Sequence, residues 1–283
     1  MSSEPLGWHV MLRLGDGRVV APDLVARRAL ATSLCRVAQS FRVLAFRAAD
    51  THVHLLAACD RAAAGRLAQA AEVSMGGALA LPVGFTPAHF EPVRDQAHLH
   101  NAFHYVLRNP AGHGAAYDPL HDASALPDLL GMRVLAPWIL PLVRERLPRL
   151  RSADLVAHLG IGDLVPSEDP TLLAQAAAAA VGLPSLEGRS ARAVAARAAA
   201  CHLGGPAWDA GPAFGGARTR RRLRTRTPDP VLLQAVRLQA GLLAAIRAKP
   251  VPPWTSDDGG PAYEAAQGDD ASAPSPASGP VPP

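Results

Sequence analysis

The segment from Thr51 to Ala58 is an apolar run interrupted by two histidines, His52 and His54. A short run of this kind, rich in valine and leucine, is typical of a buried β-strand. Because alternate side chains of a strand lie on the same face, both imidazoles are expected to point to one face of a sheet. Two neutral imidazoles on one face can bind a divalent transition-metal ion. Two ordinary strand histidines are the alternative explanation.

A second polar feature lies in the segment from Asp95 to Asn109, which is predicted to be a helix that ends before Pro110. At about 100° per residue, one stripe of the helix is apolar and is expected to face the core. An adjoining stripe is polar, and on it Tyr105 and Asn109 are i, i+4 neighbours. The apolar stripe consists of Leu99, Ala102, Phe103 and Val106, and the polar one of His98, Asn101, Tyr105 and Asn109. Packed on the sheet, this helix would bring Tyr105 and Asn109 to the rim near the histidines.

These segments together resemble the HUH single-tyrosine transposases, and most closely the REP-associated tyrosine transposases. The family pattern is an opening strand, a helix, a strand ending in His-hydrophobic-His-Leu-Leu, and a helix with Tyr-x-x-x-Asn-Pro. The matching parts here are Trp8–Leu12, Ala29–Gln39, the His52/His54 strand and Tyr105–Pro110, with Ala88–Val93 in the place of a further strand. The resemblance covers roughly residues 8 to 116. The chain departs from the pattern at Ala49–Thr51, where the family has Met-Pro-Asn or Met-Pro-Asp, and at Ala111–Gly114.

The resemblance implies an α+β fold with a central antiparallel sheet and packed helices. It also implies that Tyr105 is the nucleophile and that His52, His54 and Asn109 hold a divalent cation, Mg²⁺ or Mn²⁺. The expected reaction is cleavage of single-stranded or hairpin DNA through a 5′-phosphotyrosine intermediate, followed by strand transfer. Because a phenol has an ordinary pKa near 10, such a nucleophile needs activation. Two alternatives remain open: a catalytically inactive, domesticated DNA-binding regulator, and a metal-dependent hydrolase of small molecules.

The charge of the chain favours a polyanionic partner. The net charge of +4 becomes +9 when residues 251–283 are left out, because this stretch has five acidic residues and no Lys or Arg. Basic proteins are attracted to the phosphates of nucleic acids. Three scattered cysteines, no apparent secretory signal and no apolar run of membrane-spanning length predict a cytoplasmic protein without a membrane partner. The oligomeric state, monomer or dimer, is left open.

Four regions are expected along the chain. Residues 1–118 form the HUH nuclease domain, and 119–165 form a helical connector with helices at Pro137–Arg146 and Ala153–Leu159. Residues 166–250 form a helical DNA-binding domain, with helices from Pro170, from Ser190 to Leu203 and from Asp229 to Arg247. Residues 251–283, rich in Pro, Gly, Ser, Ala and Asp, are expected to be disordered.

A helix-turn-helix is expected between Trp208 and Thr225, with a turn at Gly215–Ala217. Its second helix would lie in the major groove of DNA. The wider stretch, from Leu186–Arg192 through Arg197 to the turn, is loosely similar to the DnaA-type helix-turn-helix attached to some REP-associated transposases, although Gly211 and Pro212 interrupt the first helix. The arginines expected to contact DNA are Arg218, Arg220, Arg221, Arg222 and Arg224. A small helical bundle with a solvated arginine face is the alternative.

Overall fold

The computed structural model describes residues 4–108, 118–205, 214 and 216–249. In this part of the chain it contains one four-stranded antiparallel sheet and ten α-helices, so the α+β class is confirmed. The elements up to residue 108 are β1 (Gly7–Arg13), α1 (Leu24–Ala38), β2 (Val43–Ala49), β3 (His52–Ala57), α2 (Arg61–Leu79), β4 (His89–Val93) and α3 (Gln96–Arg108). The predicted elements in this region are all present, with bounds shifted by up to five residues.

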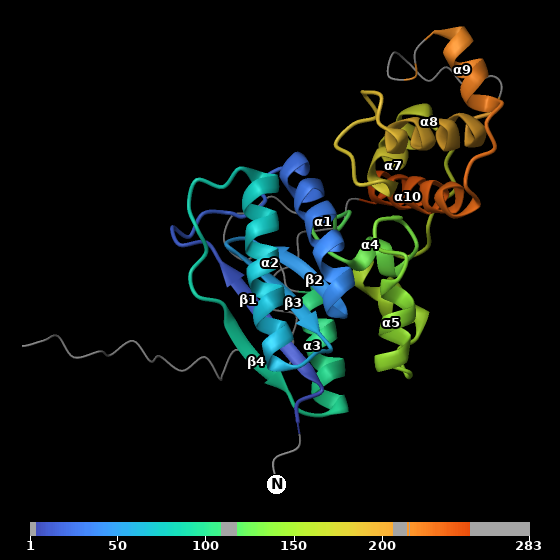
Figure 1. Ribbon diagram of the computed structural model, residues 1–283. Helices are drawn as coiled ribbons and strands as arrows, with labels where there is room; N and C mark the ends of the chain where they lie inside the picture. Colours follow the sequence, from blue (N-terminus) through green and yellow to red (C-terminus); the bar gives the residue numbers. More distant parts are fainter. Residues whose placement is uncertain (1–3, 109–117, 206–213, 215, 250–283) are drawn as a thin grey trace, which may run out of the picture. The chain divides into compact units, whose positions relative to one another are not determined.

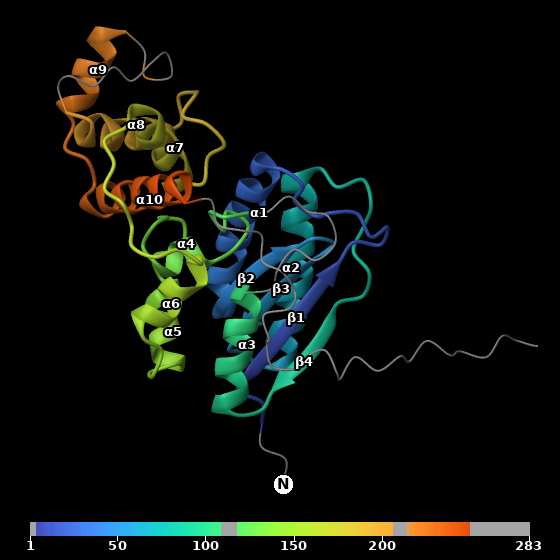
Figure 2. The ribbon, with the colours of Figure 1, turned by 180° about the vertical axis from the view of Figure 1, so that it is seen from behind.

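The sheet has the strand order β2-β3-β1-β4, and every neighbouring pair is antiparallel. The element order β-α-β-β-α-β with this strand order is the split β-α-β arrangement. Helices α1 and α2 cover one face of the sheet, and α3 covers the other (Figures 1 and 2). The sheet is therefore the middle layer of three.

The two faces of the sheet differ in chemistry. Below α1 and α2 the side chains are apolar and buried, as at Val10, Leu12, Val53 and Leu55. The strand register places a different set on the face below α3. That set includes His9, Arg13, Arg47, His52, His54, His89 and Glu91. A polar sheet face under a helix is unusual for a structural core, and it marks this layer as the candidate site.

Capping explains where several helices begin. The carboxylate of Asp23 accepts a hydrogen bond from the backbone of Ala26, so α1 begins at Leu24, five residues before the predicted start. Asp95 accepts from the backbone of His98 in the same way and fixes the start of α3. The apolar stripe predicted for this helix is buried along its length. The orientation of α3 follows from these two features.

The connector contributes α4 (Leu126–Leu129), α5 (Ile139–Arg146) and α6 (Ser152–Val156), which confirms both predicted helices. Its apolar residues, from Leu126 to Leu159, belong to the same core as the sheet. Residues 123–125 also pair with the outer edge of β2: Ala48 donates to the carbonyl of Ala123, and Ala125 donates to that of Phe46. This pairing covers an edge that would otherwise be exposed.

The C-terminal helices are α7 (Pro170–Ala180), α8 (Ala191–Leu203), α9 (Ala217–Arg224) and α10 (Pro230–Ala248). They share a second apolar core, and Asp169, Ser190 and Asp229, which lie at or next to the predicted helix starts, cap three of them. Of the first helix of the expected helix-turn-helix, the structure describes Phe214, which is buried in this second core. The rest of that helix and the expected disordered tail lie outside the described residues.

Within the described residues, α10 is the one helix long and apolar enough to cross a membrane, judged by length and composition. Its apolar residues Leu232, Val236 and Leu242 are buried against other parts of the protein. Packing inside the protein thus accounts for part of the apolar character of α10, because 39% of its apolar window is buried.

Candidate active site

Strands β1 and β3 bring three histidine side chains together. His52 and His54 lie on the same face of β3, with ring centroids 4.5 Å apart and planes nearly perpendicular. His9 comes from β1, and its Nε2 lies 2.9 Å from Nδ1 of His54. The rings of His9 and His54 are stacked, with centroids 5.1 Å apart. The two histidines predicted from β3 therefore form a cluster with a third from the neighbouring strand.

The environment of His54 keeps its imidazole neutral. The side chain is buried, with 1% of its surface exposed. Burial, followed by the neighbouring His9, His52 and Arg47, holds the pKa of His54 well below its usual range. Neutral imidazole is the form that binds metal ions and accepts protons. His54 is thus a potential ligand or base near neutral pH.

Helix α3 places the Tyr105 ring against this cluster. The ring is edge-on to His54, with centroids 5.5 Å apart, and edge-on to His9, with centroids 5.8 Å apart. Tyr105 is half-buried, at the border between the core stripe of α3 and its exposed side. Helix α3 therefore brings the aromatic ring of Tyr105 beside two of the strand imidazoles.

Arg47 anchors the C-terminal end of α3 to the sheet. It lies on β2 directly opposite His54, and its Nη1 donates to the carbonyl of Leu107 at 2.8 Å. The same nitrogen lies 2.7 Å from Nδ1 of His121. A cation at the C-terminal end of a helix also interacts favourably with the helix dipole. Arg47 thereby holds the turn that carries Tyr105 over the sheet.

The side chains fit a divalent cation in part. His52 and His54 offer two imidazole nitrogen donors on one face, which suits Mn²⁺ or another transition metal. The third expected ligand, Asn109, lies outside the described residues. Within the described ranges, no group of three or more His, Cys, Asp or Glu side chains is arranged to hold a metal ion. Of the three expected ligands, the described residues therefore include two, His52 and His54.

Two residues of the cluster were not assigned a role from the sequence. His9 was noted only as part of the opening strand, and Glu91 only as part of a strand segment. Glu91 pairs with His9 across β1 and β4, and its Oε2 lies 3.6 Å from Nδ1 of His9. Its other oxygen lies 3.9 Å from Nε2 of His98, which is on α3. The sequence signal that points to His9 is the alternation of side chains along β1. It places His9 on the opposite face of the sheet from the buried residues Val10 and Leu12.

A second chain of histidines lies on another flank of α3. Nδ1 of His104 is 2.8 Å from Nε2 of His158, and Nε2 of His104 is 3.3 Å from Nε2 of His100. Burial is the main cause that lowers the pKa of His104 to about 4 and that of His158 to about 3. His98, on the polar stripe of α3, instead approaches Glu91. His104 belongs to this second chain and is therefore positioned to support packing.

The lowered pKa values of His104 and His158 predict acid sensitivity. In the unfolded chain imidazoles titrate near pH 6.5, so between that pH and about 3 the unfolded state binds more protons than the folded one. The free energy of unfolding should therefore fall as the pH is lowered through this window and be constant above it. His158→Gln should flatten the slope in urea denaturation followed by circular dichroism, whereas His202→Gln, at an exposed position of α8, should not. An unchanged slope in His158→Gln would contradict this account.

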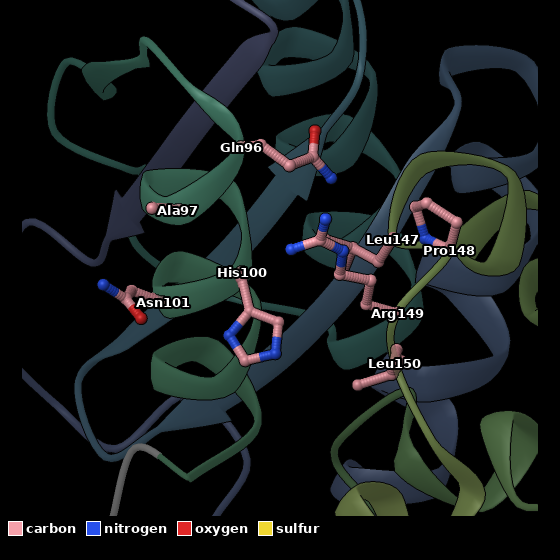
Figure 3. A pocket seen from close by; sticks show the side chains of 8 residues that line it. All are labelled: Gln96, Ala97, His100, Asn101, Leu147, Pro148, Arg149 and Leu150. Carbon is pink, nitrogen blue, oxygen red and sulfur yellow. The ribbon is translucent and has the colours of Figure 1, made fainter.

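A cleft of about 660 Å³ opens beside the same histidine chain. It is lined by Gln96, Ala97, His100 and Asn101 from α3 and by Leu147–Leu150 after α5. Figure 3 shows the Arg149 side chain reaching toward α3 between Gln96 and His100. His100 and Tyr105 are separated by about 140° around the helix axis. The cleft is therefore distinct from the cluster around Tyr105.

The arginines of α9 divide into two faces. Arg218, Arg221 and Arg222 are exposed and lie at i, i+3 and i+4, on one side of the helix. Arg220 and Arg224 are half-buried on the side of the buried Leu223, and α9 packs on α8. Of the five arginines expected to contact DNA, three are exposed to solvent.

No protein-family model, curated protein or solved structure matches this chain. Support for a function therefore comes from its own residues. The arrangement brings together a phenol, three imidazoles and a carboxylate at the border of a buried layer. Such a set can supply a nucleophile, neutral nitrogen ligands and a charge that orients them.

Proposed function

We propose that this chain is a DNA endonuclease and strand transferase of the HUH single-tyrosine transposase type, most similar to the REP-associated branch. The observation that carries the proposal is the contact of the Tyr105 ring with the imidazoles of His54 and His9, with His52 on the same sheet face. A half-buried tyrosine against the neutral imidazole of His54 is suited to nucleophilic chemistry. The order of the motifs along the chain supports the DNA substrate.

In the proposed reaction, the Tyr105 oxygen attacks a DNA phosphorus atom and loses its proton. The new P–O bond to tyrosine forms as the P–O3′ bond breaks, and the departing 3′ oxygen takes up a proton. The bond energy is kept in the 5′-phosphotyrosine link, so a 3′-hydroxyl of another strand can reverse the step. A divalent cation, Mg²⁺ or Mn²⁺, held by His52, His54 and Asn109 would supply Lewis-acid polarisation of the phosphate.

The residues around Tyr105 have supporting roles in this proposal. Arg47 fixes the turn of α3 that carries the nucleophile, and burial keeps His54 neutral. Packing of α3 over the polar sheet face restricts water near the histidines. Single-stranded or hairpin DNA is the proposed substrate, since the resemblance is to proteins that act on such DNA.

Covalent capture tests the proposal. Full-length protein is incubated with a library of hairpin oligonucleotides in MnCl₂ or MgCl₂ and analysed on a denaturing gel. A 5′-phosphotyrosine link retains the 3′-labelled strand on the protein and releases the 5′-labelled fragment with a 3′-hydroxyl. Mass spectrometry should place the link at Tyr105, and EDTA should prevent it. Binding of the library without any adduct in either metal would instead indicate a regulator.

A DNA-binding regulator without catalysis is the second candidate, and the exposed arginine face of α9 favours it. This face does not depend on Tyr105, and it can contact phosphates in either function. Changing Arg218, Arg221 and Arg222 together to alanine should weaken DNA binding and reduce the slope of log affinity against log salt by up to about three. Fluorescence anisotropy over a salt series measures both effects.

The matched control removes three other exposed arginines, Arg36, Arg144 and Arg237, which lie on α1, α5 and α10. The loss of net charge is the same, but the α9 face is intact. Equal losses of affinity and slope in the two variants would show that net charge, and not α9, is responsible for binding.

A further inference from the structure

A carboxylate, an imidazole and a second imidazole follow one another across strands β4, β1 and β3. Oε2 of Glu91 lies 3.6 Å from Nδ1 of His9, and Nε2 of His9 lies 2.9 Å from Nδ1 of His54. His9 and His54 are buried, whereas the Glu91 side chain is 36% exposed. This series of three side chains runs from Glu91, at the border of the sheet layer, to the His54 imidazole beside Tyr105.

The spacing restricts where the protons can be. At 2.9 Å, one of the two facing nitrogens must donate and the other accept. If neutral His9 donated from Nε2, its Nδ1 lone pair would face the carboxylate of Glu91, which is repulsive. If His54 donates from Nδ1, then Nδ1–H of His9 faces the carboxylate, which is attractive. For two neutral rings the second arrangement is therefore favoured.

We propose that His9 is a positioning residue that, backed by Glu91, fixes His54 as the Nδ1–H tautomer and leaves the lone pair of His54 on Nε2. For two neutral rings the tautomer follows from these two distances; its use, holding the cation beside Tyr105, rests on the proposed function. Partners of this kind orient metal-binding histidines and increase the electron density on the ligating nitrogen.

The other titratable and charged groups around Glu91, His9 and His54 are consistent with the proposed tautomer of His54. His52 lies beside His54 on β3, and Arg47 lies opposite His54 on β2. Arg47, a permanent cation, disfavours a charged His54. From α3, His98 approaches Glu91, and Tyr105 contacts both rings through its edge. Glu91 is thus the one carboxylate among these groups, and it lies on the side of His9 away from His54.

Nitrogen NMR of the metal-free protein tests the tautomer directly. Histidine labelled with ¹⁵N on both ring nitrogens is incorporated, and the His54 ring is assigned by its loss in His54→Gln. At pH 8, Nδ1 of His54 should have the shift of a protonated ring nitrogen and Nε2 that of an unprotonated one. The reverse pattern in the wild-type protein would overturn the proposal.

Variants give a second readout. His9→Phe keeps a ring but removes the acceptor, so the His54 tautomer should become mixed. Affinity for Mn²⁺, measured by electron paramagnetic resonance titration, should fall roughly 10- to 100-fold. In His9→Gln the amide oxygen can accept a hydrogen bond from Nδ1–H of His54. This variant should therefore restore most of the Nδ1–H tautomer and most of the Mn²⁺ affinity. Unchanged tautomer and affinity in His9→Phe would also overturn the proposal.

Glu91→Gln covers the case in which His9→Phe does not fold, because the Glu91 side chain is partly exposed. It should shift the His54 tautomer in the same direction to a smaller extent, and no shift would count against the role of the carboxylate. Failure of the proposed function is a separate outcome. If no phosphotyrosine forms but the tautomer and the Mn²⁺ affinities behave as stated, His9 positions His54 in a protein with another activity.

Discussion

Tyr105→Phe is expected to abolish the covalent protein–DNA adduct, with a loss of roughly 10³-fold or more, since removal of a nucleophile removes the chemical step. The phenylalanine ring can keep the edge contacts that the tyrosine ring makes with His54 and His9. Folding and DNA binding should therefore be unchanged. Denaturing gels measure the adduct, and anisotropy with uncleaved hairpin measures binding.

The matched control for this variant is Tyr263→Phe, a tyrosine in the tail beyond the described residues. It removes one phenol and leaves the proposed nucleophile in place, so adduct formation should equal that of the wild type. Persistence of the adduct in Tyr105→Phe would show that another nucleophile is used. Loss of binding together with the adduct would point to a structural role of the hydroxyl.

The parts of the fold that the sequence predicted are those with a strong local pattern. The apolar stripe of α3 follows helical periodicity, and caps such as Asp169, Ser190 and Asp229 precede alanine- and leucine-rich runs. Strand β2 and helix α2 had no predicted bounds. Strand β2 is mostly buried and lacks alternation, and α2 contains three glycines, which weaken a helical pattern. Their places depend on the pairing of β2 with β3 and on packing over the sheet.

In the candidate site, too, local sequence patterns predicted some features, whereas others depend on strand pairing. Alternation within β3 was enough to place His52 and His54 on one face. The contact between His9 and His54 joins residues 45 positions apart, and it arises from the pairing of β1 with β3. Such a register cannot be read from spacing in one sequence. For α9, helical periodicity places Arg220 on the side of Leu223, but Arg222 and Arg224 both lie about 100° from Leu223, on opposite flanks. The partial burial of Arg224 therefore depends on the packing of α9 on α8.

The largest expected loss of stability comes from a buried ion pair outside the site. Arg133 donates to Oδ2 of Asp128 through Nε at 2.8 Å and Nη2 at 2.6 Å, and both side chains are almost completely buried. Arg133 also donates to the carbonyls of Asp122 and Ser124. Oδ1 of Asp128 accepts from the backbone of Leu135 and Ala136, each at 3.0 Å. The pair thus holds together the segment that covers the edge of β2.

Arg133→Met should lower the free energy of unfolding by about 3–5 kcal/mol, because it leaves the Asp128 carboxylate buried without its cation. With a urea m-value of about 2–3 kcal/mol/M, the denaturation midpoint should fall by about 1–2.5 M. Arg18→Met, at an exposed pair in which Arg18 lies 2.6 Å from Asp16, should leave the midpoint unchanged.

A second substitution tests the physical reason for this loss. In Arg133→Met/Asp128→Asn the buried charge is gone, and the amide oxygen can still accept from Leu135 and Ala136. Because an uncompensated charge costs more than a missing hydrogen bond, the double variant should be more stable than Arg133→Met alone. If the double variant is less stable, the hydrogen bonds to Asp128 matter more than its charge, and the segment is held by geometry and not by ion pairing.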